Sequence, residues 1–597
     1  MLGPIFSREA VVAPKRSKTY VARSVYVGVL FLLLCTGYMV LDGSRTLSTA
    51  RDAAQFGRWM FSLLSPLQLL ILSALAAVGA ASSVAQEKDR RTLILLLLTR
   101  LSGSEIVAGK LAATLLGPLS MLLAALPLFL CLPLLGGVSP GQVLSVFAVT
   151  AVTVMMSGAV GTMMGLWREK TFQAIALTVM TLAIYVTTGG LIAVFDILPP
   201  PWSMAFSPPS ALAAAASPMS GLSSDLSSGG TTGIVLFLIT TAAIIVAITA
   251  WSIHRVRRWN PSREVRMRPS EIENSEDLAG GADAAATPQS WKIRSPRPVW
   301  DNPVLWREIR TWAYGRKIVL IRVAFVVVFA LAAATVHYKI QNGSAQLTGS
   351  QIGRVLPSVT LPLAAVGVVS LVLVNALAVN SITGERDSLA LDLLLVTDLR
   401  PAEFIFGKLV GVFYVAKEMI VLPLLLVIYL TTQDVITLEN TVYCVIGAIV
   451  LYIFAAMLGI HSGLNYVASR AATLASLGTI FFLCVGIAVC MTIMVSFRGS
   501  FEYQLAPFLI MILGGGAALF ATLGWRNPSN AVLLSSMALP VVTFYAITQF
   551  ILQTDHLQVF ASVTAGYLFT TAAMMIPALS EFDVSLGRDG RGDEGGG

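Results

Sequence analysis

Two short strings come close to the glycine-rich loop that cradles the phosphates of a nucleotide. Gly103–Lys110 reads GSEIVAGK, but its two glycines are one residue too far apart, and Leu111 stands where the motif needs Ser or Thr to reach Mg²⁺. The second string, Gly407–Leu409, has the same leucine after its lysine. Such a loop also needs a preceding strand in a soluble domain, and no stretch between the apolar runs is long enough to form a soluble domain. We therefore expect no nucleotide site in this chain.

Other residue types that could do chemistry are also placed unfavourably. Gly137–Gly141 reads GVSPG and matches the turn that presents a nucleophilic serine, but it joins two apolar runs rather than a strand and a helix. Proline and glycine are ordinary turn residues there. The five cysteines and four histidines show neither CxxC nor HExxH spacing. The sequence thus predicts no catalytic residue, no cofactor-binding residue and no metal site.

Any functional side chain of this protein must be carried by apolar segments. Hydrophobic residues make up 56% of the 597 residues and charged residues only 12%, whereas soluble proteins carry about 25% charged residues. A helix of about 20 apolar residues crosses the hydrocarbon core of a bilayer. Fourteen such runs lie near residues 24–41, 60–85, 107–135, 142–166, 172–195, 232–253, 318–336, 358–380, 404–432, 441–466, 472–496, 504–524, 531–552 and 557–579. We predict an all-α polytopic membrane protein with about 14 transmembrane helices.

The positions of the basic residues predict how the chain is oriented. With the N-terminus inside, 34 of the 40 Lys and Arg residues fall in inner loops or at inner helix ends, as the positive-inside rule requires. The six that fall outside are Arg45, Arg51, Arg58, Lys339, Arg354 and Arg498. Both termini are therefore predicted to be cytoplasmic. We expect these charges to contact the lipid bilayer and expect no nucleic-acid binding.

The apolar runs form two groups separated by a polar stretch. Residues 1–254 carry six predicted spans, and residues 301–580 carry eight, which we interpret as six plus two extra C-terminal spans. Residues 255–300 are basic, then acidic and rich in Ala and Gly, then basic again, which is typical of a disordered linker. The tail, residues 581–597, is predicted to be disordered as well.

One string occurs in both groups. Residues 87–110 (EKDRRTLILLLLTRLSGSEIVAGK) and 385–408 (ERDSLALDLLLVTDLRPAEFIFGK) align without a gap at an offset of 298, and 11 of 24 positions are identical. Residues 3–9 and 302–308 are also similar, at an offset of 299. Offsets this steady indicate gene duplication and fusion. Because six spans separate equivalent points, the two repeats are predicted to be parallel, with both strings on one face.

Each string combines a charged start, a Leu-rich run and a polar break, which predicts a short amphipathic helix on the inner membrane surface. Because the same charged residues recur in both halves, we favour a docking element for a partner protein over a plain loop that only orients helices. The predicted docking residues are Glu87, Asp89, Thr99, Leu101, Glu105 and Lys110 in the first string and Glu385, Asp387, Thr397, Leu399, Glu403 and Lys408 in the second.

The shared pattern E-x-D-x-x-x-L-x-L-L-L-x-T-x-L-x-x-x-E-x-x-x-G-K resembles the coupling-helix region of the ABC type-2 exporter permeases. The resemblance implies two six-span halves in the plasma or inner membrane, driven by a separate ABC ATPase subunit in two copies that binds ATP in place of this chain. The segments around Arg8 and Arg307 resemble the interfacial helix of that family, and residues 196–218 lie where it has short re-entrant helices. Because most members are single halves that dimerise, a homodimer of this chain stays open.

Lys417 and Glu418 lie inside the predicted ninth span, where a central charge costs about 2.5–3.5 kcal/mol on insertion scales. Either they reach the inner interface or pair with neighbouring helices, which we favour, or they form an intramembrane polar site for a substrate or coupling ion. The second interpretation suits a secondary transporter with parallel repeats, which is our alternative function. An ATPase-linked membrane scaffold is a further alternative.

Overall fold

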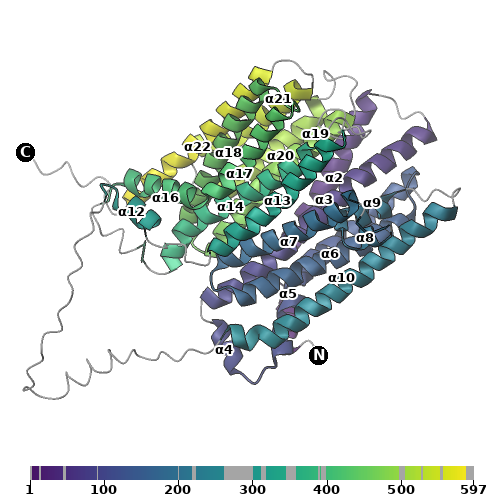
Figure 1. The fold of residues 1–597 in the computed structure, drawn as a ribbon, viewed down its shortest axis with the longest axis horizontal. Helices are drawn as coiled ribbons and strands as arrows, with labels where there is room; N and C mark the ends of the chain where they lie inside the picture. The colour runs from purple at the N-terminus through teal and green to yellow at the C-terminus, as the bar shows by residue number, and fades with distance from the viewer. Residues whose placement is uncertain are drawn as a thin grey trace, which may run out of the picture.

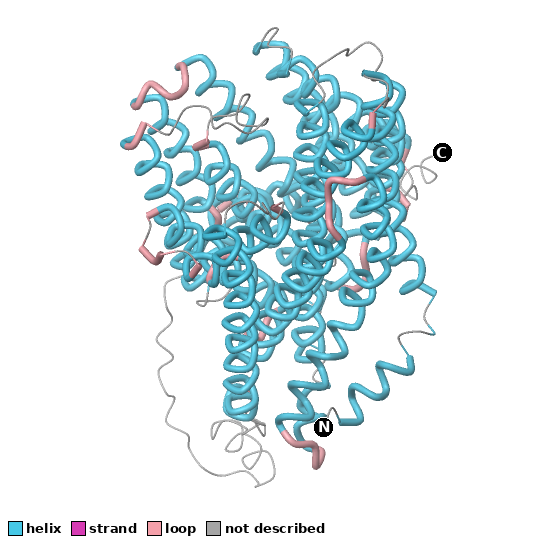
Figure 2. Tube along the Cα trace, turned by 90° about the vertical axis from the view of Figure 1, so that its right-hand side faces the viewer, coloured by secondary structure: helices cyan, strands magenta, loops and turns pink. Residues whose placement is uncertain are grey.

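The computed structural model describes residues 3–12, 15, 17–44, 49–89, 92–195, 197–199, 201–217, 224–260, 300–310, 318–343, 358–387, 390–391, 399–496, 505–525, 529–551 and 556–585. Within these residues the regular secondary structure is entirely helical, and most helices run roughly along one direction (Figure 2). Figure 1 shows the first half of the chain, in purple to teal, beside the second half, in green to yellow.

The first half contains α1 (Gly3–Val12), α2 (Ser17–Ser44), α3 (Ala50–Asp89), α4 (Thr92–Leu98), α5 (Gly103–Cys131), the 3₁₀ turn η2 (Leu132–Leu135), α6 (Pro140–Trp167), α7 (Thr171–Val194), α8 (Trp202–Ala205), α9 (Pro208–Ala216) and α10 (Ser224–Trp259). The second half contains α12 (Pro303–Arg310), α13 (Ile318–Gln341), α14 (Thr360–Asp387), α16 (Pro401–Val415), α17 (Lys417–Thr432), α18 (Leu438–Asn465), α19 (Ser469–Ser496), α20 (Leu505–Leu523), α21 (Asn530–Ile551) and α22 (His556–Ser585).

The helices confirm a multi-pass membrane protein. Among the described residues, twelve helices are long and apolar enough to cross a bilayer, and the bent pair α16–α17 raises the number to 13. The remaining predicted run, 504–524, forms α20, whose described apolar part, Phe508–Leu523, is shorter than a usual span. The predicted number of 14 is thus reached only if this short helix is counted.

Two predicted boundaries differ from the structure. Helix α10 continues to Trp259, so the first residues assigned to the linker are helical. Helix α22 continues to Ser585, so the first residues assigned to the disordered tail are helical too. The run of apolar residues ends at the membrane surface, whereas backbone hydrogen bonds continue the helix into polar sequence. The rest of the predicted linker and tail lies outside the described residues.

Local sequence explains where the helices begin. The GVSPG string is a helix start: Ser139 caps α6 together with Gln142, and Pro140 occupies the first turn, where its missing N–H costs nothing. Ser102 and Glu105 form the same kind of capping box at the start of α5. These serines are therefore used as caps.

The duplication is visible in helix packing. Gly161 and Gly165 of α6 lie against α3, and their counterparts in the second half, Gly459 and Gly463, lie against α14. A Cβ atom at Gly161 would lie 2.5 Å from the carbonyl oxygen of Ala77, and one at Gly459 would lie 2.7 Å from that of Asn375, the counterpart of Ala77. Small residues at this spacing let membrane helices approach closely, so both halves use the same contact.

Exchanging Gly459 for alanine is expected to destabilise the protein by about 1–3 kcal/mol, because the added methyl group overpacks the α14–α18 contact. A Cβ atom there would lie 2.6 Å from the Cβ of Ala378. Thermal unfolding of the purified chain in mild detergent measures the change. Gly447→Ala on the same helix is the control, because a Cβ atom at Gly447 meets nothing within 4 Å. Equal melting temperatures for the two variants would refute the close contact.

The two extra helices of the second half are not C-terminal. In the first half, the last helix, α10, packs along α6 and α5; in the second, α22 packs along the related helices α18 and α16. Ring contacts between α18 and α22, Tyr443 with Phe560 at 4.9 Å and Phe454 with Tyr567 at 5.0 Å, show that these two helices run side by side in the same direction. Helix α22 therefore takes the sixth place, and α20 and α21 are inserted before it.

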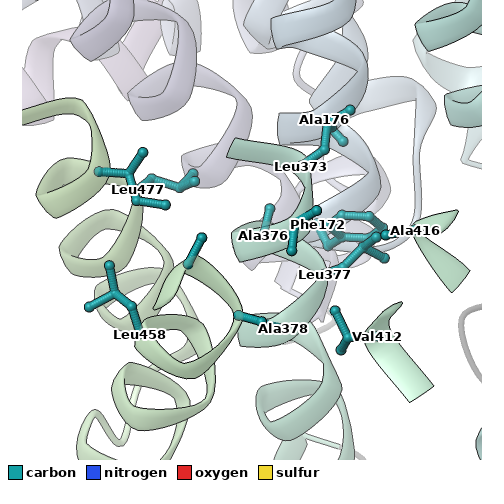
Figure 3. Close-up of a cluster of buried hydrophobic side chains, with 14 of the residues drawn as sticks. Phe172, Ala176, Leu373, Ala376, Leu377, Ala378, Val412, Ala416, Leu458 and Leu477 are labelled. Carbon is teal, nitrogen blue, oxygen red and sulfur yellow. The ribbon is translucent and has the colours of Figure 1, made fainter. Parts of the chain in front are cut away.

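The two halves share their hydrophobic cores. Helix α7 of the first half packs on α13 and α14, while α19 packs on α3 and α20 on α2. In Figure 3, Phe172 and Ala176 of α7 lie beside Leu373 and Leu377 of α14. A second cluster joins α2, α3, α5 and α6 to Val489–Val495 of α19 and to Phe508. One chain is thus sufficient to bring both halves together.

Both duplicated strings lie at the same end of the bundle, as predicted for parallel repeats. Lys88, at the end of α3, donates to the carbonyl oxygens of Leu166 and Arg168 at the end of α6. Lys170, which follows closely in the chain, lines the same cavity as Glu385 at the end of α14. We call this end of the molecule the repeat-loop end.

Candidate functional site

A buried cluster of ion pairs joins the two ends of the second string. Lys408 of α16 donates to Glu308 Oε1 of α12 at 2.5 Å and also pairs with Glu385 of α14. Arg307 pairs with Glu385 as well and lies 3.3 Å from Glu308. The side chains of Lys408 and Glu308 are each 1% exposed. Burying such charges is tolerated only when they are paired, so this cluster fixes α12, α14 and α16 to one another.

The first string is closed by the equivalent pair. Lys110 of α5 forms an ion pair with Glu87 of α3, and these two residues are the counterparts of Lys408 and Glu385 in the aligned strings. Lys110 is buried, whereas the Glu87 side chain is 38% exposed. The recurring Glu and Lys of the strings therefore pair with each other across each loop. The two lysines face inward and do not offer a surface to a partner.

A basic residue after each recurring glutamate ties the string to the fourth span of its half. Lys88 caps the carbonyl end of α6. Arg386, its counterpart in the second string, donates to the carbonyl oxygens of Gly463 at 2.6 Å and Leu464 at 3.2 Å at the end of α18. A cation at a helix C-terminus also favours the helix dipole. Sequence reasoning missed this pair because a lysine and an arginine do not count as identical.

The short helices α1 and α12 pack on the third spans. A Cβ atom at Gly3 would lie 3.0 Å from the Cβ of Glu105. In the second half, Asn302 donates to the carbonyl oxygen of Glu403 at 2.9 Å and caps α12 by accepting from the Leu305 N–H at 2.9 Å. The string of each half therefore packs against the short N-terminal segment of the same half. That segment is duplicated as well.

The short helix predicted for this string is present in the first half as α4. Leu93 is buried with Val107 and Val256, whereas Leu95 is 64% exposed and Leu98 is 69% exposed. Arg257 of α10 donates to the carbonyl oxygen of Leu101 at 3.1 Å and holds the end of the string. In the second half, residues 388–389 and 392–398, which include Thr397, lie outside the described residues.

Most of the predicted docking residues serve the fold. Glu105 accepts from the Ser102 N–H at 2.9 Å, and Glu403 accepts from the Arg400 N–H at 3.3 Å, so both cap helices. Thr99 donates to the carbonyl oxygen of Leu96 at 2.6 Å. Asp387 accepts from Ser469 of α19 at 2.5 Å, and Leu399 is buried. Asp89 ends α3, and its side chain lies outside the described residues. The exposed leucines of α4, which the prediction did not include, make no contact that accounts for their exposure within the described residues.

Lys417 and Glu418 lie at a break rather than inside a continuous span. Helices α16 and α17 are bent by 61° there. Arg322 of α13 lies 3.4 Å from Glu418 and donates to the carbonyl oxygen of Val415 at 2.9 Å, so it neutralises the charge and satisfies a carbonyl freed by the break. The Lys417 ammonium lies 5.0 Å from the centre of the Tyr414 ring. Glu418 thus pairs with the neighbouring helix α13, whereas Lys417 lies over a ring of α16, three residues earlier in the chain.

No cluster of three or more His, Cys, Asp or Glu side chains suitable for a metal ion occurs among the described residues. Comparison of the chain with protein-family models found no match, and comparison with curated proteins found none either. The function must therefore be argued from the repeat-loop end itself.

Proposed function

We propose that the chain is the membrane-spanning permease subunit of an ATP-driven exporter of the ABC type-2 kind. A separate ATPase subunit, in two copies, would dock on the two strings and bind the ATP. One observation carries the proposal: two related loops, one in each half, lie at one end of the bundle, and each is closed by a lysine–glutamate pair. A plain connecting loop needs no such closure.

The ion pairs give the docking surface a way to move the spans. A force on α4 passes to α3 and α5 through Glu87 and Lys110, and from α3 to α6 through Lys88. In the second half, Lys408 and Arg386 make the same connections to α16 and α18. Closure of an ATPase pair across the repeat-loop end would rock one half against the other, and the cargo path would open.

The proposed topology places the repeat-loop end and both termini in the cytoplasm, in agreement with the positive-inside rule. It requires α20 to cross the bilayer. His461, near the end of α18, is hydrogen-bonded to the carbonyl oxygen of Leu523 at 3.0 Å, so α20 ends at the repeat-loop end. Helix α19 begins at that end, and α20 therefore runs back through the bundle. Counting α20 gives the 14 spans.

Purification of the tagged full-length chain from its own membrane in mild detergent, followed by mass spectrometry and an ATPase assay, tests the proposal. Recovery of a nucleotide-binding subunit at about two copies per chain is the expected result. One copy per chain would indicate that whole chains pair or that one string is idle. Absence of any ATPase after crosslinking would refute the ATP-driven mechanism.

The second candidate is a secondary transporter, which the charged break between α16 and α17 favours, because broken helices carry ion sites in that class. Glu418→Gln separates the two. Under our proposal the Arg322–Glu418 pair only supports the break, and ATP-coupled turnover should fall by no more than about fivefold, as expected for a partly exposed pair. Arg322→Lys, which retains the charge, is the matched control. Loss of all transport, together with a requirement for an ion gradient, would favour the second candidate.

A further inference from the structure

The last turns of α6 and α10 are joined at the repeat-loop end. The two helices run side by side (Figure 1). Asn260, which follows α10, donates to the carbonyl oxygen of Leu166 in α6 at 3.3 Å. The rings of Trp167 and Trp259, the last residues of the two helices, lie 6.5 Å apart from centre to centre. These contacts hold the side chains at the two helix ends in fixed relative positions.

Two arginines at these helix ends are stacked on indole rings. The guanidinium carbon of Arg168 lies 3.4 Å from the centre of the Trp167 ring, and that of Arg255 lies 4.7 Å from the centre of the Trp251 ring. Guanidinium groups favour stacking on an aromatic face, and the stack orders a side chain that would otherwise be flexible. We call these four residues the arginine–tryptophan corner.

Neither guanidinium group of the corner has an acceptor among the described residues. In both Arg168 and Arg255 the Nε atom is buried without a hydrogen-bond partner, whereas the outer nitrogens, which make no hydrogen bond there either, are not buried. Arg257, two residues after Arg255, differs, because it donates to the carbonyl oxygen of Leu101 at 3.1 Å. Ordered and accessible donors that face no acceptor of the chain favour an anion from outside it.

The corner carries positive charge that the neighbouring residues do not balance. Arg168 is only 8% exposed. Burial lowers the pKa of its guanidinium, and the carboxylate of Glu169 acts in the opposite direction. Glu169 itself is exposed, and Lys170 and Arg258 add two exposed cations beside the corner in the chain. Burying a cation is costly unless an anion accompanies it, so a bound anion would lower this cost.

The corner also lies where a span ends at the surface of the bilayer. Trp251 is 52% exposed and Trp167 is 37% exposed, and indole rings in such positions are typical of the headgroup region. Among the twelve continuous candidate spans, α10 is the least buried, with 17% of its most apolar stretch covered by protein. Its side is therefore open to lipid chains. Basic clusters beside a span at this level bind lipid headgroups, so a lipid phosphate is the anion closest at hand.

We propose that the arginine–tryptophan corner binds an anionic phospholipid of the adjoining leaflet. Its phosphate accepts from the outer nitrogens of Arg168 and Arg255, because guanidinium groups donate to phosphate oxygens in pairs, and its acyl chains lie along α10. Lys170 and Arg258 repel the cationic group of a zwitterionic lipid and so favour one with net negative charge. The bound lipid ties α6 to α10. This binding does not depend on an ATPase partner.

Native mass spectrometry of the full-length chain, released from nanodiscs with equal amounts of phosphatidylglycerol and phosphatidylcholine, tests the site. The unaltered chain is expected to retain phosphatidylglycerol selectively. Arg255→Gln should weaken that binding at least about tenfold, since hydrogen bonds from a charged group are lost, and Arg168→Gln should weaken it as well. Arg257→Gln is the matched control. It removes the same charge two residues away, but its guanidinium already has an acceptor, so this variant should retain the lipid.

The melting temperature in mild detergent gives a second measurement, because a ligand that binds only the folded chain stabilises it. Short-chain phosphatidylglycerol should raise the melting temperature of the unaltered chain and of Arg257→Gln, but not that of Arg255→Gln. Equal retention of the two lipids by the unaltered chain would overturn the proposal. Equal loss of binding in Arg257→Gln and Arg255→Gln would also overturn it, because binding would then follow net charge alone. Displacement of the lipid by inorganic phosphate would identify a soluble anion as the ligand instead.

Discussion

Replacing Lys408 with methionine is expected to lower the free energy of unfolding by about 3–5 kcal/mol, because breaking a buried ion pair leaves an uncompensated charge. Glu308 and Glu385 both rely on this ammonium group, and the Glu308 side chain is only 1% exposed. Methionine fills a similar volume, so the loss reports the charge and not a cavity. Unfolding of the purified chain in mild detergent, followed by circular dichroism, measures it.

The matched control is Lys110→Met in the first half. Lys110 pairs with Glu87, whose side chain is 38% exposed and is solvated by water once the lysine is gone. Its loss of stability should therefore be clearly smaller. Combining Lys408→Met with Glu308→Leu should recover part of the loss, because an apolar pair replaces a broken ion pair. Equal losses at the two lysines would contradict the difference in burial.

Placing aspartate at both Leu95 and Leu98 is expected to abolish co-purification of the proposed ATPase subunit and the ATP-coupled transport that we propose. These are the exposed leucines of α4. Loss of an apolar anchor at an interface costs at least about 2 kcal/mol, or roughly thirtyfold in affinity per side chain. Pull-down of the ATPase subunit and its hydrolysis rate in the complex are the measurements.

Leu438→Asp is the control for this surface. Leu438 is 72% exposed and begins α18 at the end of the bundle opposite the strings. It should leave ATPase binding unchanged. If the α4 variant still binds the ATPase normally, α4 rests on lipid and the docking surface lies elsewhere; if both variants lose binding, the effect is on membrane insertion.

The sequence predicts the helices of this fold well. It predicts less well which helices pack against one another. Apolar length located each candidate membrane helix among the described residues, and the offset that relates Glu87 to Glu385 also relates Gly161 to Gly459. The place of α22 could not be predicted, because hydropathy measures length and composition and carries no information on which helices touch. Only contacts such as Tyr443 with Phe560 show that α20 and α21 are the inserted pair.

The sequence located the residues of the candidate site, but it did not predict correctly what most of them do. Recurrence marked Lys110 and Lys408, but only burial shows that they face inward, to the carboxylates at the opposite ends of their own strings. The break at Ala416 carries no proline or glycine, whereas Pro118, its counterpart in the first half, lies within the continuous helix α5. Arg322 donates to the carbonyl oxygen of Val415 at this break, and such tertiary partners are invisible to local propensity.

The insertion of α20 and α21 means that the two halves are related without being interchangeable. Helix α7 lies directly along α13, but at the related place α20 lies against α2. No exact twofold axis survives, and two identical partner subunits would each meet a different face. The two docking sites proposed for the partner are therefore expected to differ in affinity. A gene encoding one half twice would lose this difference between the two halves.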